Sequence, residues 1–417
     1  MLSYTHFFRL ASSDDLQAQI DAATAVVSAN ISEDSPMIEA ADRPLFSDDH
    51  HAFRDTVRRV LTDVIEPRLD DHERDGIVER EAWQKVGAAG LLCPQVPEPY
   101  GGPGLDFTFN AIVGEELSYM GSAAGFTLQS DIVADYIVHY GSEEQKKRYL
   151  PGMVAGTTIS AIAMTEPGAG SDLQRIRTIA RADGNGWKLS GSKTYITNGQ
   201  AADLVIVAAR TTEEGGARGL SLFLVEEGDE GFSRGRNLDK IGLHGNDTSE
   251  LFFDEVKLPA DRLLGAENGG FPMLMQQLPQ ERLSIAVQSQ ASAQRAFDEA
   301  VKFTSDRKAF GKRVVEFQNT RFTLADLKAR LQVGWAHLDW AIARHVAGKL
   351  TPAEASAAKL WHSEMQWETC DTALQLHGGA GYMNEYPIAR LWRDARVARI
   401  YGGTSEIMRE LIGRTIG

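Results

Sequence analysis

Three short segments carry residue types that bind polar ligands. The first, AMTEPGAGSD at residues 163–172, places Gly168 and Gly170 close to the hydroxyl groups of Thr165 and Ser171. Glycines let consecutive backbone N–H groups turn toward one point, so this loop suits a planar polar ring or an anionic group. It is not a dinucleotide-binding fingerprint, because the glycine spacing differs and no strand is expected before it in a βαβ unit.

The second segment, KTYITNG, is expected to be a strand. Because side chains alternate along a strand, Tyr195 and Thr197 should point to the same face. An aromatic ring beside a hydroxyl group could stack on a flat cofactor and hydrogen-bond to its edge. An ordinary aromatic–threonine pair between neighbouring strands explains these residues equally well, so both interpretations stay open.

The third segment, RIYGGTSE, has two adjacent glycines, Gly402 and Gly403, between an aromatic residue and a hydroxyl-bearing pair. On spacing alone they form a turn that ends one helix and starts the next, with Thr404 as N-cap. The alternative is that another molecule or side chain comes close to the backbone at this point, which glycine permits.

The composition is typical of a globular protein with two or three domains. The chain has 417 residues, 43% of them hydrophobic, and a net charge of −15. This charge, without any clustered basic run, disfavours a nucleic-acid partner. The two cysteines, Cys93 and Cys370, lack metal-ligand spacing, which indicates a reducing compartment and no zinc or other metal site. No apolar run approaches the roughly 20 residues of a membrane-spanning helix, so no integral membrane segment is expected.

The N-terminal part of the chain is expected to be helical after an extension. Residues 1–45 form this extension, with a short helix near residues 14–28. Its excess of acidic residues disfavours a secretory or mitochondrial leader. Residues 46–160 show helical periodicity behind a plausible Ser47 N-cap.

A β module and a second helical region follow. Residues 161–268 contain a hairpin signal at DGNG and apolar strands at LVIVAAR and GLSLFLVEE. Residues 269–417 return to long helices, one of which begins with the capping box TPAE at Thr351. The predicted architecture is therefore helices, a β module and a helical bundle.

Six segments together resemble the acyl-CoA dehydrogenase family. They are PEPYGGPGLD, TEPGAGSD, KTYITNG, DRKAFGK, QLHGGAGYMNEYPIARLWRDARV and YGGTSEI, in the order and spacing of the family from about Leu45 onward. LQSDIV and LPQERL are most similar to its long-chain branch. The resemblance implies an α+β multidomain fold with an N-terminal α-helical domain, a central β-barrel-like domain and a C-terminal four-helix bundle.

The resemblance also implies FAD as cofactor. Matched position by position, the isoalloxazine ring would be surrounded by Met164, Thr165, Gly170, Ser171, Tyr195 and Thr197, the last reaching its N5 edge. The pyrophosphate and adenosine would be held by Arg307, Phe310 and Gln318. Further cofactor positions fall on Gln375, Gly379, Thr404 and Glu406, and substrate positions on Ser171, Arg282 and Tyr401.

One departure from the family pattern concerns the catalytic base. Many members carry a glutamate directly after the tyrosine, where this chain has Gly402. In the long-chain and isovaleryl branches the base comes from the helix that opens the C-terminal domain, and the matching residue is Glu281 in PQERLS. We expect the missing side chain at Gly402 to leave room for the Glu281 carboxylate. The competing interpretation is a surface carboxylate paired with Arg282.

The mechanism implied by the resemblance uses both residues. Glu281 would take the pro-R α-proton while a hydride leaves the β-carbon. The Gly402 N–H and the ribityl 2′-hydroxyl of FAD would bond to the thioester oxygen, which gathers negative charge. A working base near neutral pH needs a raised pKa, which burial would provide.

The expected function is dehydrogenation of an acyl-CoA to a trans-2-enoyl-CoA, in fatty-acid or branched acyl-CoA catabolism. The implied partners are an electron-transfer flavoprotein as acceptor and further copies of the chain, most often as a homotetramer. A non-catalytic FAD-binding partner subunit and an acyl-CoA oxidase are the alternatives, although such oxidases usually carry an additional C-terminal domain. A cytoplasmic location is expected if the source is bacterial, ahead of a mitochondrial matrix.

Overall fold

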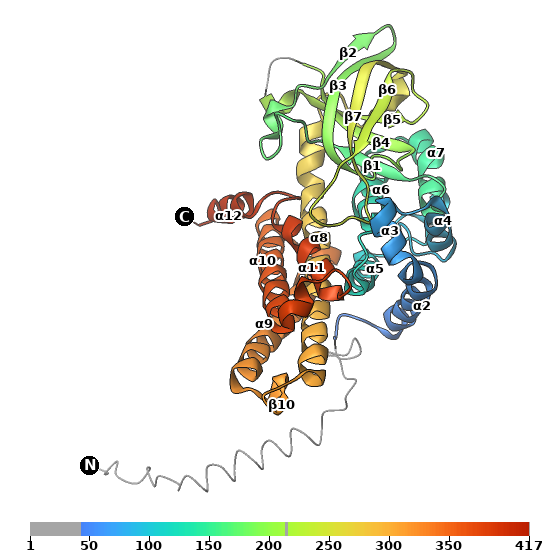
Figure 1. Cartoon of the computed structure of the whole chain (residues 1–417). Helices are drawn as coiled ribbons and strands as arrows, with labels where there is room; N and C mark the ends of the chain where they lie inside the picture. Colours follow the sequence, from blue (N-terminus) through green and yellow to red (C-terminus); the bar gives the residue numbers. More distant parts are fainter. Residues whose placement is uncertain (1–42, 213–215, 417) are drawn as a thin grey trace, which may run out of the picture. The chain divides into compact units, whose positions relative to one another are not determined.

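The computed structural model describes residues 43–212 and 216–416. From Pro44 onward these residues belong to one compact unit. The expected N-terminal extension, with its helix near residues 14–28, lies outside the described residues except for its last three positions. The three-part fold is confirmed: helices come first, a sheet follows, and long helices close the chain (Figure 1).

The first part is helical, and Ser47 is the N-cap of its first described helix, as predicted. The LQSDIV segment forms a π-helical turn, η4. The elements are α2 (Asp48–Val64), η2 (Glu66–Arg68), α3 (Leu69–Asp75), α4 (Arg80–Ala88), η3 (Glu98–Tyr100), α5 (Phe107–Met120), η4 (Leu128–Val133), α6 (Ala134–Tyr140) and α7 (Glu143–Val154).

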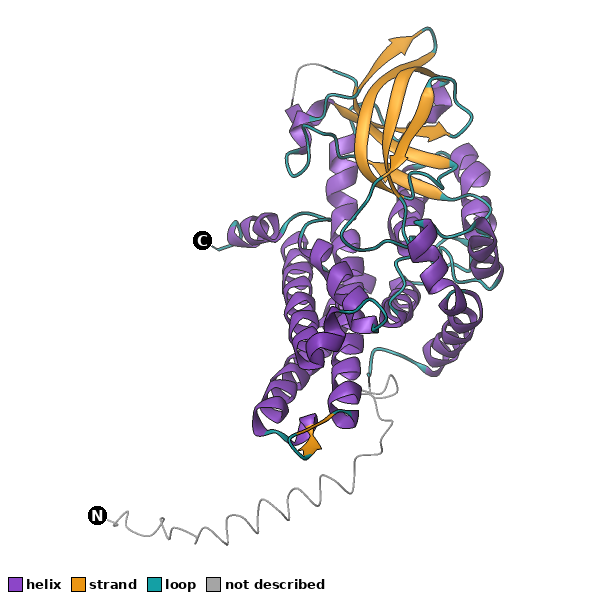
Figure 2. Ribbon diagram, viewed as in Figure 1, coloured by secondary structure: helices purple, strands orange, loops and turns teal. Residues whose placement is uncertain are grey.

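The middle part is an eight-stranded mixed sheet in the order β6-β7-β3-β2-β4-β5-β8, with β1 pairing in parallel to β4. Figure 2 shows that the sheet is strongly curved. The predicted hairpin at DGNG joins β2 to β3. The elements are β1 (Ser160–Ala163), η5 (Leu173–Arg175), β2 (Ile179–Asp183), β3 (Gly186–Thr197), β4 (Leu204–Arg210), η6 (Gly216–Gly219), β5 (Leu220–Glu226), β6 (Phe232–Asn237), β7 (Thr248–Leu258), η7 (Ala260–Arg262) and β8 (Leu263–Leu264).

The two most apolar strands, β4 and β5, are covered on both faces. In β4, Leu204 and Ile206 face the core shared with the N-terminal helices, while Val205 and Val207 face a second core inside the sheet. A strand buried on both faces has no polar face, so it appears in the sequence as a continuous apolar run. That is why LVIVAAR and GLSLFLVEE were recognisable as strands.

The last part is built on α8, α9 and α10, which pack on one another together with the shorter α11. Thr351 and Glu354 form the predicted capping box, with the Glu354 N–H donating to Thr351 Oγ1 at 3.2 Å. Two-residue strands, β9 and β10, were not anticipated. The elements are α8 (Gly270–Asp306), β9 (Lys308–Ala309), β10 (Lys312–Arg313), η8 (Val314–Glu316), α9 (Gln318–Val346), α10 (Pro352–His377), η9 (Gly378–Tyr382), α11 (Pro387–Ala395), η10 (Arg396–Arg399) and α12 (Ser405–Gly413).

Helix α8 connects the sheet to the far end of the bundle. Its first turn packs against β5, and its other end contacts β10 (Figure 1). With 37 residues it is about 54 Å long at 1.5 Å per residue. Residues at its two ends therefore cannot contact the same small molecule.

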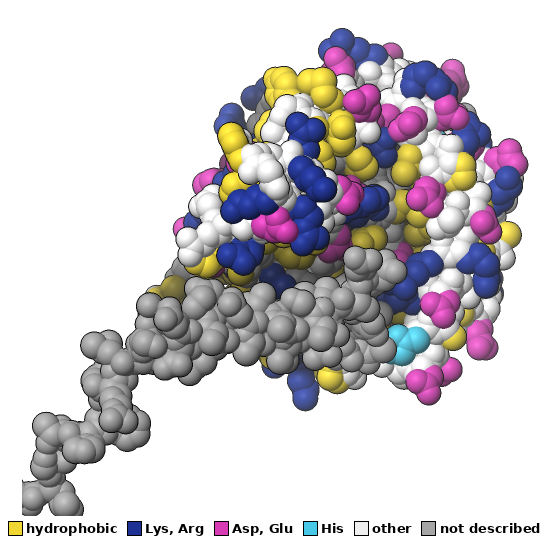
Figure 3. Space-filling view, turned by 60° about the horizontal axis from the view of Figure 1, so that its bottom comes forward, with side chains coloured by type: hydrophobic (Ala, Val, Ile, Leu, Met, Phe, Trp, Pro, Cys, Tyr) yellow, Lys and Arg dark blue, Asp and Glu magenta, His cyan; other side chains and the backbone are white. Residues whose placement is uncertain are grey.

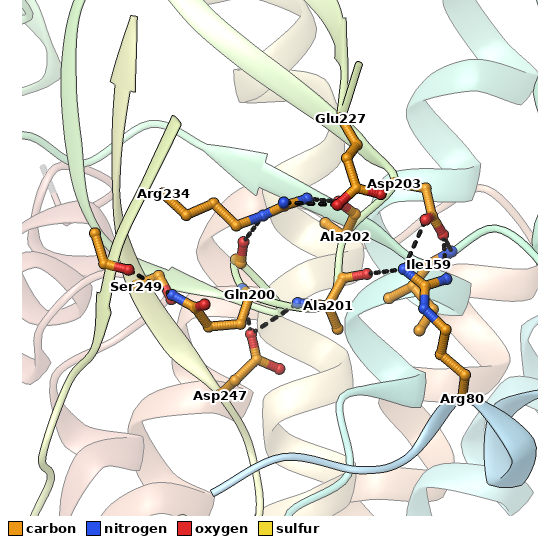
Figure 4. A network of polar contacts seen from close by, with 12 residues as sticks. Arg80, Ile159, Gln200, Ala201, Ala202, Asp203, Glu227, Arg234, Asp247 and Ser249 are labelled. Carbon is orange, nitrogen blue, oxygen red and sulfur yellow. Dashed lines mark hydrogen bonds and ion pairs between the residues drawn. The ribbon is translucent and has the colours of Figure 1, made fainter. Parts of the chain in front are cut away.

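A polar network holds the turn that follows β3 (Figure 4). Arg80 of α4 forms an ion pair with Asp203 at 2.7 Å, and Asp247 accepts a hydrogen bond of 2.6 Å from the Gln200 N–H. The end of β3, where Thr197 lies, is thus tied to both the helical domain and the segment that enters β7.

Candidate functional site

The carboxyl group of Glu281 is buried in the first third of α8. Its Oε2 atom is closed to solvent and has no hydrogen-bond partner among the described residues. Burial raises the pKa of Glu281 to about 7, although the adjacent Arg282 guanidinium acts to lower it. In the described part of the chain, Glu281 Oε2 and Arg282 Nε are both buried without a hydrogen-bond partner. A carboxylate that has lost water without gaining a partner can accept a proton near neutral pH.

The backbone of Gly402 faces this carboxylate. Gly402 has a φ of 62°, and a Cβ added there would lie 2.3 Å from Ile285 Cδ1 and 4.0 Å from Glu281 Oε1. The position of a Cβ at 402 is therefore taken by Ile285 of α8, and the Glu281 carboxylate lies at ordinary van der Waals distance from that position. The helix-turn interpretation also holds, since Thr404 accepts a hydrogen bond of 3.4 Å from the Ile407 N–H at the start of α12. The turn therefore starts a helix and also lies close to α8, while the expectation that Gly402 makes room for the Glu281 carboxylate stays a prediction.

Side chains of α10 hold this turn in place. Lys359 is fully buried, and its Nζ donates to the Gly403 carbonyl at 2.7 Å. Glu364 accepts a hydrogen bond of 2.7 Å from Ser405 Oγ and pairs with Arg399 at 2.9 Å. Sequence reasoning missed Lys359, although its setting in AAKLW, a charge among small and apolar residues, was a usable signal.

Two predicted substrate residues flank the same region. Arg282 is buried, its Nη1 donates to Ser356 Oγ of α10 at 3.3 Å, and its Nε has no partner among the described residues. Tyr401 is exposed at the start of the turn. The structure therefore brings Glu281, Arg282, Tyr401 and Gly402 together. Glu406 lies beyond them in α12, exposed and 3.8 Å from Arg409.

The glycine-rich loop forms a second group of predicted residues. It follows β1, a strand that sequence reasoning missed because it is only four residues long. Buried Lys193 donates to Glu166 at 2.8 Å and to the Met164 carbonyl at 3.1 Å, and the Thr194 N–H donates to the Thr165 carbonyl. These bonds fix the base of the loop.

The outer part of this loop is open. A Cβ added at Gly168 or Gly170 would meet no atom within 4 Å, and Ser171 is exposed. The loop therefore offers free backbone and hydroxyl groups above a fixed base, as expected for a site that receives a ring or an anion.

Tyr195 and Thr197 lie beside the loop in β3. Tyr195 is 69% exposed, and Ile196 between them is buried, so the expected alternation holds over these three residues. Upstream it fails, because a bulge lies between Lys193 and Ile196 and Tyr195 has a φ of 61°. The bulge turns the Tyr195 ring outward, and bulges commonly re-aim side chains next to sites.

The third group lies beyond the other end of α8. Arg307, Gln375 and Gly379 line a groove of about 490 Å³. Phe310, on the turn between β9 and β10, is 97% exposed, and Gln318 is exposed at the start of α9. The view that brings this end forward shows Lys and Arg side chains among carboxylates (Figure 3). An arginine in an open groove suits a phosphate group.

The residues present fit FAD, but in two halves. The loop and the Tyr195–Thr197 pair have the hydroxyls, free amides and exposed aromatic ring for a flavin, and the groove has the arginine for a pyrophosphate. No described contact joins the groove to the loop or to Glu281. Within the described residues no cluster of metal-binding side chains occurs, and no helix has the length and apolarity to cross a membrane.

Comparison with known proteins identifies the family. Residues 47–157, 161–256 and 268–417 match the models of the acyl-CoA dehydrogenase N-terminal, middle and C-terminal domains. The mitochondrial long-chain specific acyl-CoA dehydrogenase of Sus scrofa is 51% identical over 377 residues, 90% of this chain and 88% of that protein. The resemblance to the long-chain branch is thus confirmed.

Solved structures agree with this result. An acyl-CoA dehydrogenase from Geobacillus kaustophilus superposes with a TM-score of 0.88 at 46% identity, covering 90% of this chain and 99% of that one. A glutaryl-CoA dehydrogenase from Mycobacterium smegmatis in complex with FADH2 superposes with a TM-score of 0.85 at 29% identity, covering 92% and 98%. The chain therefore belongs to the acyl-CoA dehydrogenase family, whose members are FAD-dependent oxidoreductases.

Proposed function

We propose that Glu281 is the base with which this FAD-dependent acyl-CoA dehydrogenase removes the pro-R α-proton of its substrate. One observation carries the proposal: Glu281 Oε2 is buried without a partner among the described residues, and Glu281 Oε1 lies 4.0 Å from the position that a Cβ at Gly402 would take. A pKa of about 7 keeps a large fraction of the carboxylate ionised near neutral pH while making it a far stronger base than an ordinary glutamate.

The Gly402 N–H is the proposed partner of the thioester oxygen. Among the described residues it donates to no acceptor. Loss of the α-proton places negative charge on that oxygen, and a pre-positioned N–H stabilises the charge as it forms. FAD, when bound, accepts the hydride that leaves the β-carbon. Gly402 contributes only its backbone, which explains why the residue can lack a side chain.

Replacement of Glu281 by Gln tests the base. We expect Glu281→Gln to bind FAD but to lose about 10²- to 10⁴-fold in the anaerobic rate of flavin reduction by acyl-CoA. Asp298→Asn is the matched control, since Asp298 is a half-buried carboxyl group on the same helix that accepts a hydrogen bond from Tyr119. Near-normal reduction by Glu281→Gln would show that the base lies elsewhere. This result would still rule out a non-catalytic subunit, because such a subunit reduces no flavin.

The substrate and the electron acceptor are proposed from the family. Similarity to the Sus scrofa protein supports a long-chain acyl-CoA as substrate. An electron-transfer flavoprotein is the acceptor that the family resemblance implies, and a solved structure described as an electron-transferring flavoprotein of Acidaminococcus fermentans superposes on this chain with a TM-score of 0.86 at 34% identity. Rates measured over straight, branched and aromatic acyl-CoAs test the substrate. The proposed acceptor is wrong if oxygen reoxidises the reduced enzyme as fast as the electron-transfer flavoprotein does, which is the behaviour of an oxidase. If the source is bacterial we propose a cytoplasmic location, which cell fractionation tests.

We also propose that each FAD site is shared between two copies of the chain, within a homotetramer. The loop lies near the beginning of α8 and the groove beyond its end, about 54 Å along the helix. One FAD cannot bridge that distance, so the groove that completes a site must come from another copy.

Complementation tests this sharing. Glu281→Gln chains mixed with Arg307→Ala chains can form sites that combine the intact base of one chain with the intact groove of the other. We expect such mixed oligomers to recover activity at limiting FAD that neither variant has alone. Absence of recovery, in oligomers shown by native mass spectrometry to be mixed, would place both halves in one chain.

A further inference from the structure

Lys359 is a buried cation without a carboxylate partner in the described residues. It lies on α10 with no exposed surface, and its Nζ bonds to the Gly403 carbonyl at 2.7 Å. Burial lowers the pKa of Lys359 to about 8, and the nearby Arg282 charge lowers it further. Glu364 and Glu406 raise this pKa only through longer-range charge, and burying an ammonium group with no carboxylate in direct contact is unfavourable. Such a costly arrangement indicates a function other than stability.

The turn above Lys359 has few other restraints. Gly402 and Gly403 have φ angles of 62° and 96°, a pair of left-handed residues that is loosely ordered unless something holds it. Before the pair, the Tyr401 N–H donates to the Val397 carbonyl; after it, α12 begins. Between these points, the two glycines make one polar contact with the described residues, the hydrogen bond from Lys359 Nζ to the Gly403 carbonyl.

The side chains around the turn fit this role. A Cβ at Gly403 would lie 2.7 Å from Met408 Cε, and one at Gly402 would lie 2.3 Å from Ile285 Cδ1. The backbone is thus packed from two sides by apolar groups, and Lys359 sets the direction of its carbonyl. The same ammonium charge, in a site of low dielectric constant, favours negative charge that develops nearby.

We propose that Lys359 is a positioning residue for proton removal: its ammonium group holds the Gly403 carbonyl and thereby aims the Gly402 N–H at the thioester oxygen. This inference rests on the proposed role of the Gly402 N–H. Helix α10 would then take part in the reaction indirectly. Within the described residues, Lys359 is hydrogen-bonded to neither Glu281 nor the backbone of Gly402.

The test isolates proton removal from hydride transfer. An acyl-CoA with a quaternary β-carbon can lose its α-proton but has no β-hydrogen to transfer, so deuterium uptake from D2O at its α-carbon reports the first step alone. In the FAD-bound enzyme we expect Lys359→Met to slow this exchange about 10²-fold, the effect of misplacing a catalytic group by about 1 Å. In Lys359→Met, KM for a normal acyl-CoA should change by a smaller factor than the exchange rate does. Lys359→Arg should retain most of the exchange rate.

Lys240→Met is the matched control. Lys240 is a half-buried lysine outside this turn that donates to the Asn246 carbonyl and to Thr248 Oγ1, and its pKa is also lowered to about 8 by burial. Its loss should leave exchange at the normal rate. If Lys359→Met takes up deuterium at the rate of the unaltered enzyme and Glu281→Gln takes it up more slowly, the inference fails and Glu281 remains the proposed base.

Two further outcomes are decisive. If Glu281→Gln takes up deuterium at the normal rate and Lys359→Met does not, Glu281 is not the base, but the positioning role of Lys359 stands. If Lys359→Met does not fold or loses FAD, Lys359→Gln, which keeps a shorter donor, replaces it in the same comparison. Failure of both variants to hold FAD would make Lys359 a structural residue and overturn the inference.

Discussion

Polar atoms beside the first third of α8 and polar atoms beyond its last residue differ in their exposure to solvent. Around Glu281 the polar atoms are buried, and one carboxylate oxygen is left without a partner. Around Arg307 they are exposed in an open groove. The difference supports the proposed arrangement, in which proton removal takes place within one chain, where burial can shift a pKa, and the far end of the cofactor binds on an open surface that another copy covers.

Next to the loss of Glu281 itself, Gly402→Ala should have the largest effect on catalysis in the buried region. The added Cβ would lie 2.3 Å from Ile285 Cδ1 at a φ of 62°, so the turn must move. We expect the rate of flavin reduction to fall about 10²- to 10³-fold, as when one oxyanion donor is lost. FAD retention should not change, because the groove lies elsewhere.

Gly228→Ala is the control for this change, since a Cβ there meets no atom within 4 Å. Adding Ile285→Ala to Gly402→Ala relieves the contact and should restore part of the rate. A normal rate in Gly402→Ala alone would mean that the fit between the turn and α8 is not needed for catalysis.

The buried Glu281 carboxyl group should also reduce stability as the pH rises above the pKa of an ordinary glutamate. In the folded chain the pKa of Glu281 is about 7, against 4.5 for a free glutamate, so the folded state binds more protons and stability falls as pH rises from 4.5 to 7. Glu281→Gln removes this cost. We expect its free energy of unfolding to exceed that of the unaltered enzyme by about 3 kcal/mol at pH 8 and about 1 kcal/mol at pH 5.

Denaturant unfolding at the two pH values measures this gain. Glu410→Gln, which alters an exposed carboxylate beside Arg414, should change little at either pH. An equal effect of Glu281→Gln at pH 5 and pH 8 would contradict a raised pKa. The acid side of the kcat/KM profile should independently show a pKa near 7 that is absent from the glutamine variant.

Arg307→Ala should act on cofactor binding instead. Loss of one hydrogen bond to a charged group costs about 1.5–3 kcal/mol, so we expect FAD to bind about 10- to 100-fold more weakly. The reduction rate at saturating FAD should stay normal. Lys308→Ala, an exposed neighbour in β9, is the control. A loss of rate at saturating FAD would abolish the distinction between the two regions.

Thr197→Ala should give the smallest effect. One neutral hydrogen bond contributes about 0.5–1.5 kcal/mol, so flavin reduction should slow about 2- to 10-fold with the fold intact. Thr248→Ala, directly across the strand pair, controls for lost packing in the sheet. An unchanged rate would leave Thr197 as the ordinary strand residue that its sequence context equally allowed.

The sequence alone determined much of the fold, because the signals involved are local. The Ser47 N-cap, the Thr351 capping box and the DGNG hairpin each depend on residues within a few positions of one another. Longer-range order came from the family motifs. The strand β1 and the bulge before Ile196 escaped detection, since four residues carry little periodicity and a bulge is set by pairing with a distant strand.

For the candidate site, the sequence named Glu281 and Gly402 but not their relation. Only the tertiary structure brings residues 121 positions apart close to each other, removes water from one carboxylate oxygen and places the Lys359 ammonium group against the Gly403 carbonyl. A pKa and a pre-positioned N–H depend on everything packed around them, and that packing is a property of the whole fold rather than of any segment.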